Sequence, residues 1–364
     1  MHCASLGEFE QGRPLLEKIK QDFSSYKIII TFFSPSGYEI RKNYMGADAI
    51  FYLPMDDPIN SEKFIDIIKP TLVLWIKYEY WYHYLITLKK SNIPVLLVSG
   101  IFREEQPFFK WYGKMWKKMI YSYRHLFVQD EKSRLLVQHY LQEKVTANGD
   151  TRFDRVIDIA ENSDALPEIK KFCSNNNVIV AGSTWEEDEK ILIHFIHAHP
   201  EIKFIIAPHE TDKAHLSDMK KEIKSGVFYS QLNDIEKVAE NSNVLIIDNI
   251  GMLSRLYKYA TITYVGGGFN ASGIHNILEA AVYGRPVIFG PVYEKFIEAT
   301  GLVECGGAFS IKNALQLEAL LNDLLSDNEK LAFSSNAAKD YVYHNRGATG
   351  RIMNYITENR LLIN

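Results

Sequence analysis

Short apolar runs alternate with longer amphipathic segments along the whole chain. In the first half, runs rich in β-branched and aromatic residues occupy positions 27–33, 49–53, 71–76, 94–99 and 125–129. After Pro167 the rhythm restarts, with apolar runs at 178–181, 203–207, 244–248, 261–265 and 286–289. Because these runs are apolar throughout, they predict parallel strands that helices cover on both faces. The sequence therefore predicts an α/β protein with two Rossmann-like domains, each built on a parallel sheet.

Length and composition place the domain boundary near the middle of the chain. A chain of 364 residues exceeds what one hydrophobic core usually supports. Residues 151–167 mix charged side chains with Asn and Ser and end in Pro, which is typical of a linker. We expect an N-terminal domain over 1–155, a linker over 156–167 and a C-terminal domain over 168–340. Helices over 341–364 are expected to pack back on the N-terminal domain.

Ligands of open parallel sheets bind beyond the carboxyl ends of the strands. We therefore expect the function to lie in the loops that follow the strands, with the two sheets facing a central cleft. Residues 1–5 are typical of the end of a strand, and the earlier part of that strand is expected to be missing.

The bulk composition narrows the function only slightly. Residues 1–155 hold 22 Lys and Arg against 18 Asp and Glu, whereas the remainder holds 19 against 27. This asymmetry suits a first half that faces an anionic surface, and ordinary solvated surfaces also vary this much. The three cysteines are far apart and lack a C-x-x-C spacing, which argues against disulfides or a thiolate metal site. The longest apolar runs fall short of the roughly 20 residues that cross a bilayer, and no export signal is present.

The most informative stretch is YVGGGFNASGIHNILEAAVYGRPVIFGP, at 264–291. It predicts a strand, a glycine turn that includes Gly267 and Gly268, and a helix that begins near Asn276. Backbone amides of such a turn and the amino end of the helix favour a phosphate. Glu279 is expected to accept hydrogen bonds from two ribose hydroxyls, and His275 is a candidate partner of the phosphate. The alternative is that the glycines only make a tight turn, that Glu279 complements the helix dipole and that His275 is structural.

Other strand ends carry polar or glycine-containing loops as well. Ser183 and Thr184 follow the run at 178–181, His209 follows the run at 203–207, and Ile250 and Gly251 follow the run at 244–248. Together these loops predict a nucleotide-binding crevice in the second half. No H-E-x-x-H, paired Cys/His or Asp-x-Asp spacing occurs, the nearest being Glu186-Glu187-Asp188, so we expect neither a catalytic metal nor a cofactor.

Two acids in the first half are candidates for catalysis. Glu8 lies in Ser5-Leu6-Gly7-Glu8, between the expected strand end and a helix, where a carboxylate can act as a general base. The same spacing, Ser5-x-x-Glu8, is also that of a capping box, in which the glutamate only accepts a backbone hydrogen bond. Glu79 follows the run at 71–76 directly and is either a functional acid or a solvated surface charge.

Residues 102–124 combine aromatic and basic side chains in one segment, FREEQPFFKWYGKMWKKMIYSYR. Such a combination suits the interface of an anionic membrane, where each nearby cation contributes about 1 kcal/mol. A crossover helix whose lysines extend along its apolar surface would have a similar sequence.

Several motifs, in this order, resemble those of the Kdo transferases, which are the 3-deoxy-D-manno-octulosonic acid transferases of glycosyltransferase family 30. They are HCASLGEFEQGRP, KYEYWYHYL, NGDTRFDRV, AGSTWEEDE, IIDNIGML and GGGFNASGIHNILEAAVYGRPVIFGP. The resemblance covers nearly the whole chain and implies the GT-B fold of two Rossmann-like domains. It implies transfer of Kdo from CMP-Kdo to a primary hydroxyl of the lipid A precursor, lipid IVA, with inversion and without metal.

The resemblance also implies roles for individual residues. Glu8 would be the general base, and Glu79 a second acid that orients the sugar or acceptor. Gly7 and the loops that hold Ser183, Thr184, His209, Ile250, Gly251, Gly267, Gly268, His275, Asn276 and Glu279 would bind the donor. Such an enzyme acts at the cytoplasmic face of the bacterial inner membrane, and we expect no nucleic acid partner.

Two features depart from the family pattern. Members commonly carry an arginine in a Pro-Arg-His loop, but Ala207-Pro208-His209 has none, so the phosphate charge falls to His209, His275 or a lysine. Members also usually have an N-terminal membrane anchor, which is expected to be missing here. The alternatives are a GT-B transferase that uses a UDP-sugar and a lipid-linked acceptor, a nucleotide-sugar epimerase of the same fold, and a non-catalytic membrane-binding module.

Overall fold

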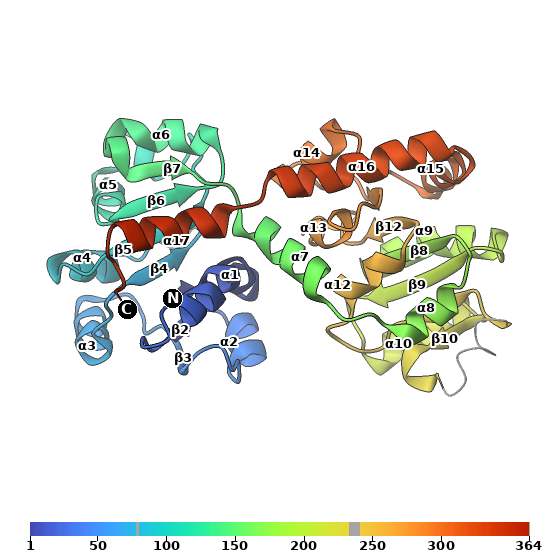
Figure 1. The fold of residues 1–364 in the computed structure, drawn as a ribbon, viewed down its shortest axis with the longest axis horizontal. Helices are drawn as coiled ribbons and strands as arrows, with labels where there is room; N and C mark the ends of the chain where they lie inside the picture. The colour runs from blue at the N-terminus through green and yellow to red at the C-terminus, as the bar shows by residue number, and fades with distance from the viewer. Residues whose placement is uncertain (78–79, 233–240, 364) are drawn as a thin grey trace. The chain divides into compact units, whose positions relative to one another are not determined.

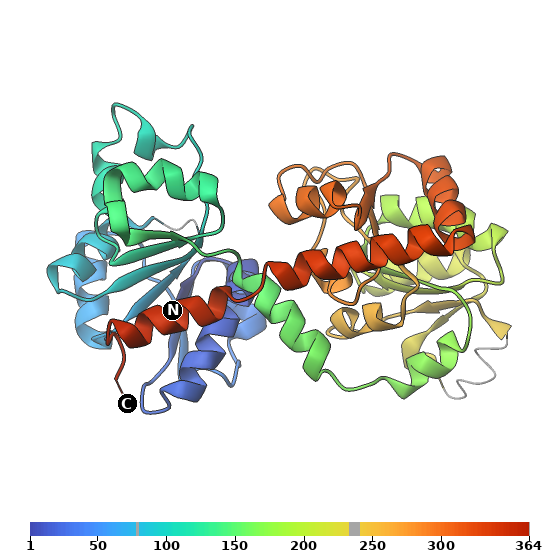
Figure 2. The same cartoon turned by 45° about the horizontal axis from the view of Figure 1, so that its top comes forward.

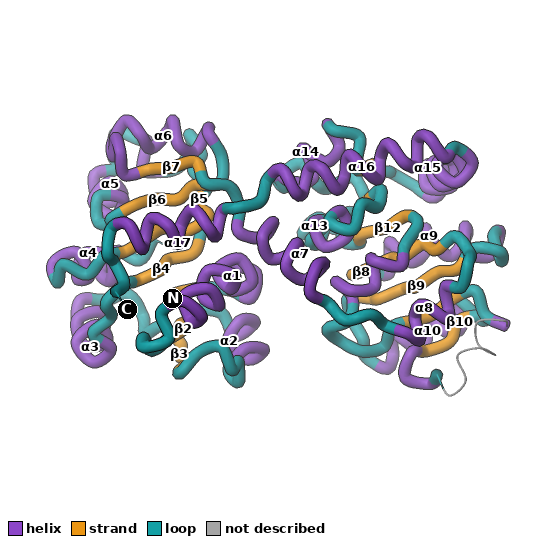
Figure 3. Tube along the Cα trace, viewed as in Figure 1, coloured by secondary structure: helices purple, strands orange, loops and turns teal. Residues whose placement is uncertain are grey.

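The structure is a computed structural model that describes residues 1–77, 80–232 and 241–363. The chain divides into two compact units, each of which is described by itself: unit 1 is Met1–Arg155 with Asn345–Asn364, and unit 2 is Val156–His344. In both units every pairing between described strands is parallel. The predicted α/β fold with two parallel sheets is confirmed (Figures 1 and 3).

The sheet of unit 1 has the strand order β3-β2-β1-β4-β5-β6-β7. Its strands are β1 His2–Cys3, β2 Ile29–Phe32, β3 Ala49–Tyr52, β4 Val73–Ile76, β5 Val95–Gly100, β6 His125–Val128 and β7 Val145–Ala147. Its helices are α1 Leu6–Asp22, α2 Pro35–Arg41, α3 Pro58–Ile68, α4 Tyr82–Lys90, α5 Lys114–Ile120, α6 Glu131–Leu141 and α17 Ala348–Glu358. Two 3-10 turns, η1 Pro107–Phe109 and η2 Gln142–Lys144, complete it.

Helices cover both faces of this sheet, as the continuous apolar strands predicted. Phe9, Leu16 and Ile19 of α1 pack in one cluster with Ile352 and Ile356 of α17. A second cluster lies against α3, α4, α5 and α6. Helix α17 therefore brings the C-terminal residues into the core of unit 1, where it packs beside α1 (Figure 2).

The sheet of unit 2 has the strand order β10-β11-β9-β8-β12-β13-β14. Its strands are β8 Val178–Thr184, β9 Lys203–Pro208, β10 Gly226–Phe228, β11 Val244–Ile246, β12 Ile262–Val265, β13 Val287–Phe289 and β14 Ala308–Ser310. Its helices are α8 Pro167–Cys173, α9 Glu186–Ala198, α10 Lys213–Glu222, α12 Leu253–Leu256, α13 Leu278–Ala281, α14 Ile297–Glu304, α15 Ala314–Ser326 and α16 Asn328–His344. The 3-10 turns are η3 Tyr229–Gln231 and η4 Tyr257–Tyr259.

Helix α7, Thr151–Asn162, occupies much of the segment in which the sequence indicated a linker. Its charged, Asn-containing composition resembled a loop, but its apolar positions Phe153, Val156 and Ile157 are all buried. The spacing of these three residues is that of one helix face, which explains why the segment is helical.

Candidate active site

The first turn of α1 holds Glu8 in the geometry of a helix cap. Ser5 is the N-cap, and its hydroxyl accepts a hydrogen bond from the Glu8 amide at 3.5 Å. The Glu8 carboxylate accepts a hydrogen bond from the Ala4 amide at 2.5 Å, and the residue is only 8% exposed. The carboxylate therefore caps the start of the helix through Ala4, the residue before the N-cap Ser5, and its position after β1 is also the one expected of a strand-end base.

Gly7 precedes Glu8 and is exposed, and a Cβ built on it would meet nothing within 4 Å. A ligand can therefore approach the backbone here without displacing a side chain. Glu79, the second predicted acid, lies outside the described residues.

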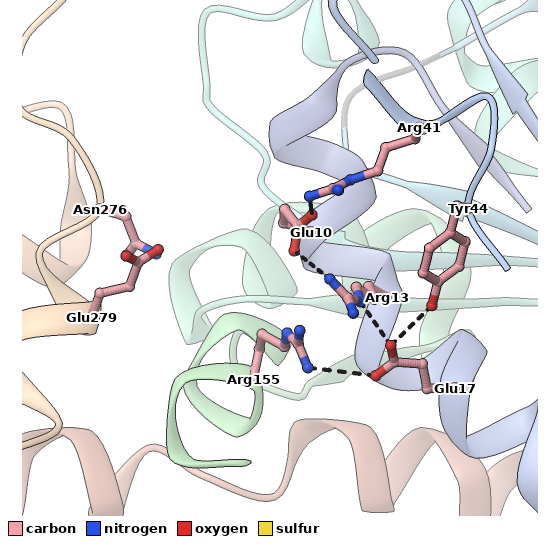
Figure 4. Close-up of polar contacts among 8 residues, drawn as sticks. All are labelled: Glu10, Arg13, Glu17, Arg41, Tyr44, Arg155, Asn276 and Glu279. Atoms are coloured by element: carbon pink, nitrogen blue, oxygen red, sulfur yellow. Dashed lines mark hydrogen bonds and ion pairs between the residues drawn. The ribbon is translucent and has the colours of Figure 1, made fainter. Parts of the chain in front are cut away.

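A charge network that the sequence did not predict runs along α1 (Figure 4). Glu10 pairs with Arg41 at 2.7 Å and with Arg13 at 3.6 Å. Glu17 pairs with Arg13 at 2.7 Å and with Arg155 at 3.5 Å, and it accepts a hydrogen bond from the Tyr44 hydroxyl. Burial and the neighbouring Glu17 raise the pKa of Tyr44 to about 12, so the hydroxyl keeps its proton. The network ties α1 to α2 and α7 within unit 1.

The motif NGDTRFDRV anchors helix α17 to unit 1. Asn148 donates to the Ala348 carbonyl at 3.0 Å, and Arg351 donates to the Asn148 side-chain and backbone oxygens at 3.1 and 2.6 Å. The Asp154 carboxylate accepts hydrogen bonds from the Gly347 and Thr349 amides at 2.5 and 2.6 Å. These contacts join residues about 200 positions apart in the chain, which a local sequence pattern does not reveal.

Asp150, in the same motif, is 4% exposed and accepts a hydrogen bond from Gln11 at 2.7 Å. Burial alone would raise the pKa of its carboxyl, but the charge and hydrogen bonds of Arg152 and the Gln11 hydrogen bond keep that pKa below its usual value. Gln11 lies one turn beyond Glu8, so this contact orients the start of α1.

In unit 2 the glycine turn after β12 is a tightly packed structure. Gly267 has a φ of +91°, and a Cβ on it would lie 2.6 Å from the Gly273 carbonyl oxygen. A Cβ on Gly268 would lie 2.6 Å from the Gly290 backbone. The Gly267 amide donates to Asp188 at 2.9 Å, which occupies the amide predicted to be available for a phosphate. The tight-turn interpretation of these glycines therefore describes their geometry.

Asp188 and Glu189 are buried acids that the sequence analysis did not assign. Asp188 also accepts hydrogen bonds from the Tyr264 hydroxyl at 2.7 Å and the Trp185 amide at 3.0 Å. Glu189 accepts a hydrogen bond from Thr184 at 2.9 Å and contacts His215 at 3.1 Å. Burial raises the pKa of both carboxyls, and the hydrogen bonds that they accept lower it only in part.

These contacts bear directly on the residues predicted to follow β8. The Thr184 side chain is fully buried and its hydroxyl is used by Glu189. Ser183 is partly exposed with a φ of +53°, a left-handed backbone conformation that is uncommon for serine. The loop after β8 therefore presents Ser183, whereas Thr184 points into the structure.

His275 lies in a stack of rings with His209 and Trp185. Trp185 donates from Nε1 to Nε2 of His275 at 3.0 Å. The ring centroid of His209 lies 4.6 Å from that of Trp185 and 4.5 Å from that of His275. Burial, and then the neighbouring His209, lowers the pKa of His275 to about 4, so the ring is neutral at pH 7. The structure thus brings together two predicted donor residues, His209 and His275, around a tryptophan that the sequence analysis did not single out.

The helix expected to begin near Asn276 begins at Leu278 and is short. Helix α13 comprises Leu278–Ala281, with Glu279 in its first turn as predicted, and a helix of a single turn has only a small dipole. Asn276 donates to Glu279 at 3.0 Å, and the two side chains lie next to each other (Figure 4). The Glu279 carboxylate is partly exposed and held in place by this bond.

The remaining predicted donor loop follows β11. Ile250 is 91% exposed, and Gly251 has a φ of +98°, where an added Cβ would meet no atom within 4 Å. The loop is therefore open to solvent, and glycine suits its left-handed backbone.

The basic and aromatic segment 102–124 separates into buried and exposed parts. Phe102 and Phe108 are 2% and 1% exposed and belong to the core, where Trp116 packs on Phe108. Trp111 is 94% exposed and Tyr112 57%. The described part of the chain contains no group of acids, histidines and cysteines suited to hold a metal ion. None of its helices is both long and apolar enough to cross a membrane.

Comparisons with known proteins agree with the motifs. Residues 1–155 match the profile of the 3-deoxy-D-manno-octulosonic-acid transferase (Kdo transferase) family. The chain is 27% identical to the 3-deoxy-D-manno-octulosonic acid transferase of Haemophilus influenzae, over 98% of the chain and 86% of that protein. It is 27% identical to the transferase of the same name from Aquifex aeolicus, over 91% of the chain and 87% of that protein. The resemblance drawn from the sequence is confirmed.

Solved structures share the fold at low identity. UDP-GlcNAc 2-epimerase from Neisseria meningitidis, bound to UDP-GlcNAc, matches with a TM-score of 0.67 at 14% identity, over 98% of each chain. A glycosyltransferase from Rickettsia africae matches with a TM-score of 0.60 at 13% identity, over 98% of this chain and 96% of that one. At these identities the likeness establishes the fold alone, which is the GT-B architecture that transferases and epimerases share.

Proposed function

We propose that this glycosyltransferase, whose residues 1–155 match the Kdo transferase family, transfers Kdo from CMP-Kdo to the lipid A precursor, lipid IVA. The observation that carries the proposal is the match of this domain, which includes Glu8 in Ser5-Leu6-Gly7-Glu8. The C-terminal domain binds the donor and the N-terminal domain binds the acceptor.

In the proposed reaction a primary hydroxyl of the acceptor attacks the anomeric carbon of Kdo. The new carbon–oxygen bond forms as the bond between that carbon and the CMP phosphate breaks, and the electron pair leaves with CMP. Glu8 takes the proton of the attacking hydroxyl. A single displacement of this kind inverts the anomeric centre, and it proceeds here without a metal ion. Glu79 is the second acid that orients the sugar or the acceptor.

Two observations support Glu8 as the base even though it also caps α1. One carboxylate oxygen accepts the Ala4 amide, which fixes the side chain at the start of the helix. Beside it, Gly7 leaves the backbone open to a ligand. A fixed base next to an open approach is the geometry that general base catalysis needs, and such a base contributes roughly 10²–10⁴ in rate.

The donor is proposed to bind at the loops that follow β8, β9, β11 and β12. Glu279, oriented by Asn276, accepts hydrogen bonds from the ribose hydroxyls. Ser183, His209 and His275 contact the phosphate, while Ile250, Gly251, Gly267 and Gly268 shape the pocket. Thr184 acts indirectly in this scheme, because its hydroxyl already holds Glu189 beneath the loop.

We further propose that segment 102–124 contacts an anionic membrane, at the cytoplasmic face of the bacterial inner membrane. Trp111 is almost fully exposed and is adjacent to Lys110, and the exposed Lys114 begins α5 three residues further on. An exposed tryptophan among cations is suited to the boundary between lipid headgroups and acyl chains.

The test separates the two roles of Glu8 through one substitution. In Glu8→Gln the amide oxygen still accepts the Ala4 amide, so the cap is kept, but the side chain no longer takes a proton. We expect unfolding by urea to be nearly unchanged and transfer to fall by about 10²–10⁴-fold. Transfer is measured as the Kdo-sized mass gain of a tetra-acylated lipid A precursor incubated with CMP-Kdo.

Glu8→Ala is the matched control, because it removes both roles and should also cost roughly 0.5–2 kcal/mol of stability. Full activity in Glu8→Gln would leave Glu8 with the capping role only. A parallel incubation with UDP-N-acetylglucosamine distinguishes the proposed donor from a UDP-sugar, since turnover there would contradict the proposal.

A further inference from the structure

Three rings from three adjacent strand ends form a stack in unit 2. Trp185 follows β8, His209 follows β9, and His275 follows the glycine turn after β12, and these strands are neighbours in the sheet. Trp185 and His209 are nearly parallel, with an interplanar angle of 25°, and His209 and His275 lie at 30°. The ring of Trp185 also reaches His275 through the Nε1–Nε2 hydrogen bond of 3.0 Å.

This hydrogen bond determines where the proton of His275 lies. The indole Nε1–H is a donor only, so Nε2 of His275 must be the acceptor and carry no proton. The pKa of His275 is lowered to about 4, by burial first and by His209 second, so the imidazole is neutral at pH 7. A neutral imidazole with an unprotonated Nε2 carries its hydrogen on Nδ1.

The surroundings hold this imidazole in one position. The His275 amide donates to the Gly266 carbonyl at 3.1 Å. A Cβ on Gly267 would lie 2.9 Å from Cδ2 of His275, so the ring packs directly on the glycine backbone. Among the residues that the structure describes, no hydrogen-bond partner of His275 Nδ1 is found. A fixed N–H is thus left without a partner among the described residues.

We propose that Trp185 is a positioning residue, which holds His275 in the tautomer whose Nδ1–H donates to a phosphate oxygen of the nucleotide donor. The inference rests on the proposed function for the identity of the ligand. A donor fixed in advance stabilises the charge that develops on a departing phosphate without reorganisation during the reaction. The loop after β9 lacks an arginine, so a correctly oriented imidazole has to stabilise a larger share of this negative charge.

The first measurement is spectroscopic and does not depend on turnover. In ¹⁵N-histidine-labelled full-length protein at pH 7, the two ring nitrogens of His275 report its tautomer, and His275→Asn identifies the signals. We expect the Nδ1–H form in the wild type. Trp185→Phe keeps a ring for His209 to stack on but removes the N–H, and we expect the Nε2–H form to appear.

The second measurement is the dissociation constant of CMP by calorimetry. Loss of one oriented hydrogen bond should weaken CMP binding about two- to tenfold in Trp185→Phe. His275→Asn places an amide N–H near the position of Nδ1 and has no tautomers, so Trp185→Phe should have no further effect in that background. A purely structural role of Trp185 would weaken binding equally in both backgrounds.

Trp75→Phe is the matched control. Trp75 is 2% exposed in unit 1, and its Nε1 has no hydrogen-bond partner among the described residues. This variant should change neither the His275 signals nor CMP binding. The proposal is overturned if the wild type shows the Nε2–H or protonated form, if Trp185→Phe leaves the tautomer unchanged, or if the tautomer changes while CMP binding does not. A wild type that does not bind CMP would instead contradict the proposed function.

Discussion

Removal of the Asp154 carboxylate tests whether the motif NGDTRFDRV is a structural clamp. Helix α17 has Gly347 as its N-cap, and glycine offers no side chain to the free amides of the first turn. Asp154 of α7 replaces the missing cap from another helix, with hydrogen bonds to the Gly347 and Thr349 amides. A carboxylate at this point also complements the partial positive charge of the helix start.

The magnitude follows from these contacts. Loss of an N-cap costs about 0.5–2 kcal/mol, and a hydrogen bond to a charged group contributes about 1.5–3 kcal/mol. Because the two bonds share one carboxylate, we expect Asp154→Ala to lower the free energy of unfolding by roughly 2–3 kcal/mol. Asp154→Asn keeps one acceptor oxygen without the charge and should cost about 1 kcal/mol.

The loss should appear in the unfolding of unit 1 as a whole. Ile352 and Ile356 of α17 are fully buried in its core, so release of the helix would expose apolar surface worth about 1.5–3 kcal/mol per side chain. Urea unfolding measures the overall loss, and hydrogen exchange of peptides over 346–358 locates it. Asp158→Ala, which removes an exposed carboxylate one turn further along α7, should change stability by no more than about 0.5 kcal/mol. Equal stability of Asp154→Ala and wild type, or equal losses in the two variants, would refute the clamp.

Two further predictions concern acid stability and membrane contact. Burial, and then the charge of Arg124, lowers the pKa of His125 to about 4. As pH falls below about 6.5, the unfolded state therefore binds a proton that the folded state does not bind, and stability is lost progressively towards pH 4. Urea unfolding at pH 7 and pH 4.5 should therefore show that His125→Gln loses roughly 2 kcal/mol less than wild type between these values, and equal losses would contradict this. Trp111→Ser should leave stability within about 0.5 kcal/mol but weaken cosedimentation with vesicles of phosphatidylglycerol and phosphatidylethanolamine about tenfold. Leu315→Ser, at a 76% exposed position of unit 2, is the control, and unchanged binding of Trp111→Ser would exclude the segment as a membrane contact.

The sequence predicted most strands of the two sheets but missed β7, β10 and β14. Strands β5 and β9 are continuous apolar runs, which mark a buried parallel strand whatever its neighbours. Strands β7, β10 and β14 have only three residues each, and none of them lies in an apolar run as long as those of β5 and β9. Helix α13, which was predicted only by its start, ends at Ala281, and the chain turns at Gly284, where φ is +64°.

The candidate site was predicted in part, and the omissions have physical causes. Glu186-Glu187-Asp188 resembles a solvated first turn, yet Asp188 is fully buried and Glu189 is 5% exposed. Helical spacing places both on the face of Leu192 and Ile196, so the apolar periodicity of α9 contained the signal. The contacts of Asp154 and Asn148 with residues after 346 had no such signal, because only the fold brings these segments together.

The hydrogen bonds that Asp188 accepts limit which groups can donate to a departing phosphate and stabilise its negative charge. Its carboxylate already accepts the Gly267 amide, so that amide has no hydrogen left for a ligand. The loop after β9 contains histidine without the arginine common in the family, and α13 is too short to present a substantial dipole. In the proposed reaction, which uses no metal ion, we expect the charge to fall mainly to Ser183, His209 and His275. A neutral imidazole can donate to the phosphate only if the nitrogen that faces it carries the hydrogen. In the proposed chemistry the indole of Trp185 ensures this, because it holds His275 in the Nδ1–H tautomer.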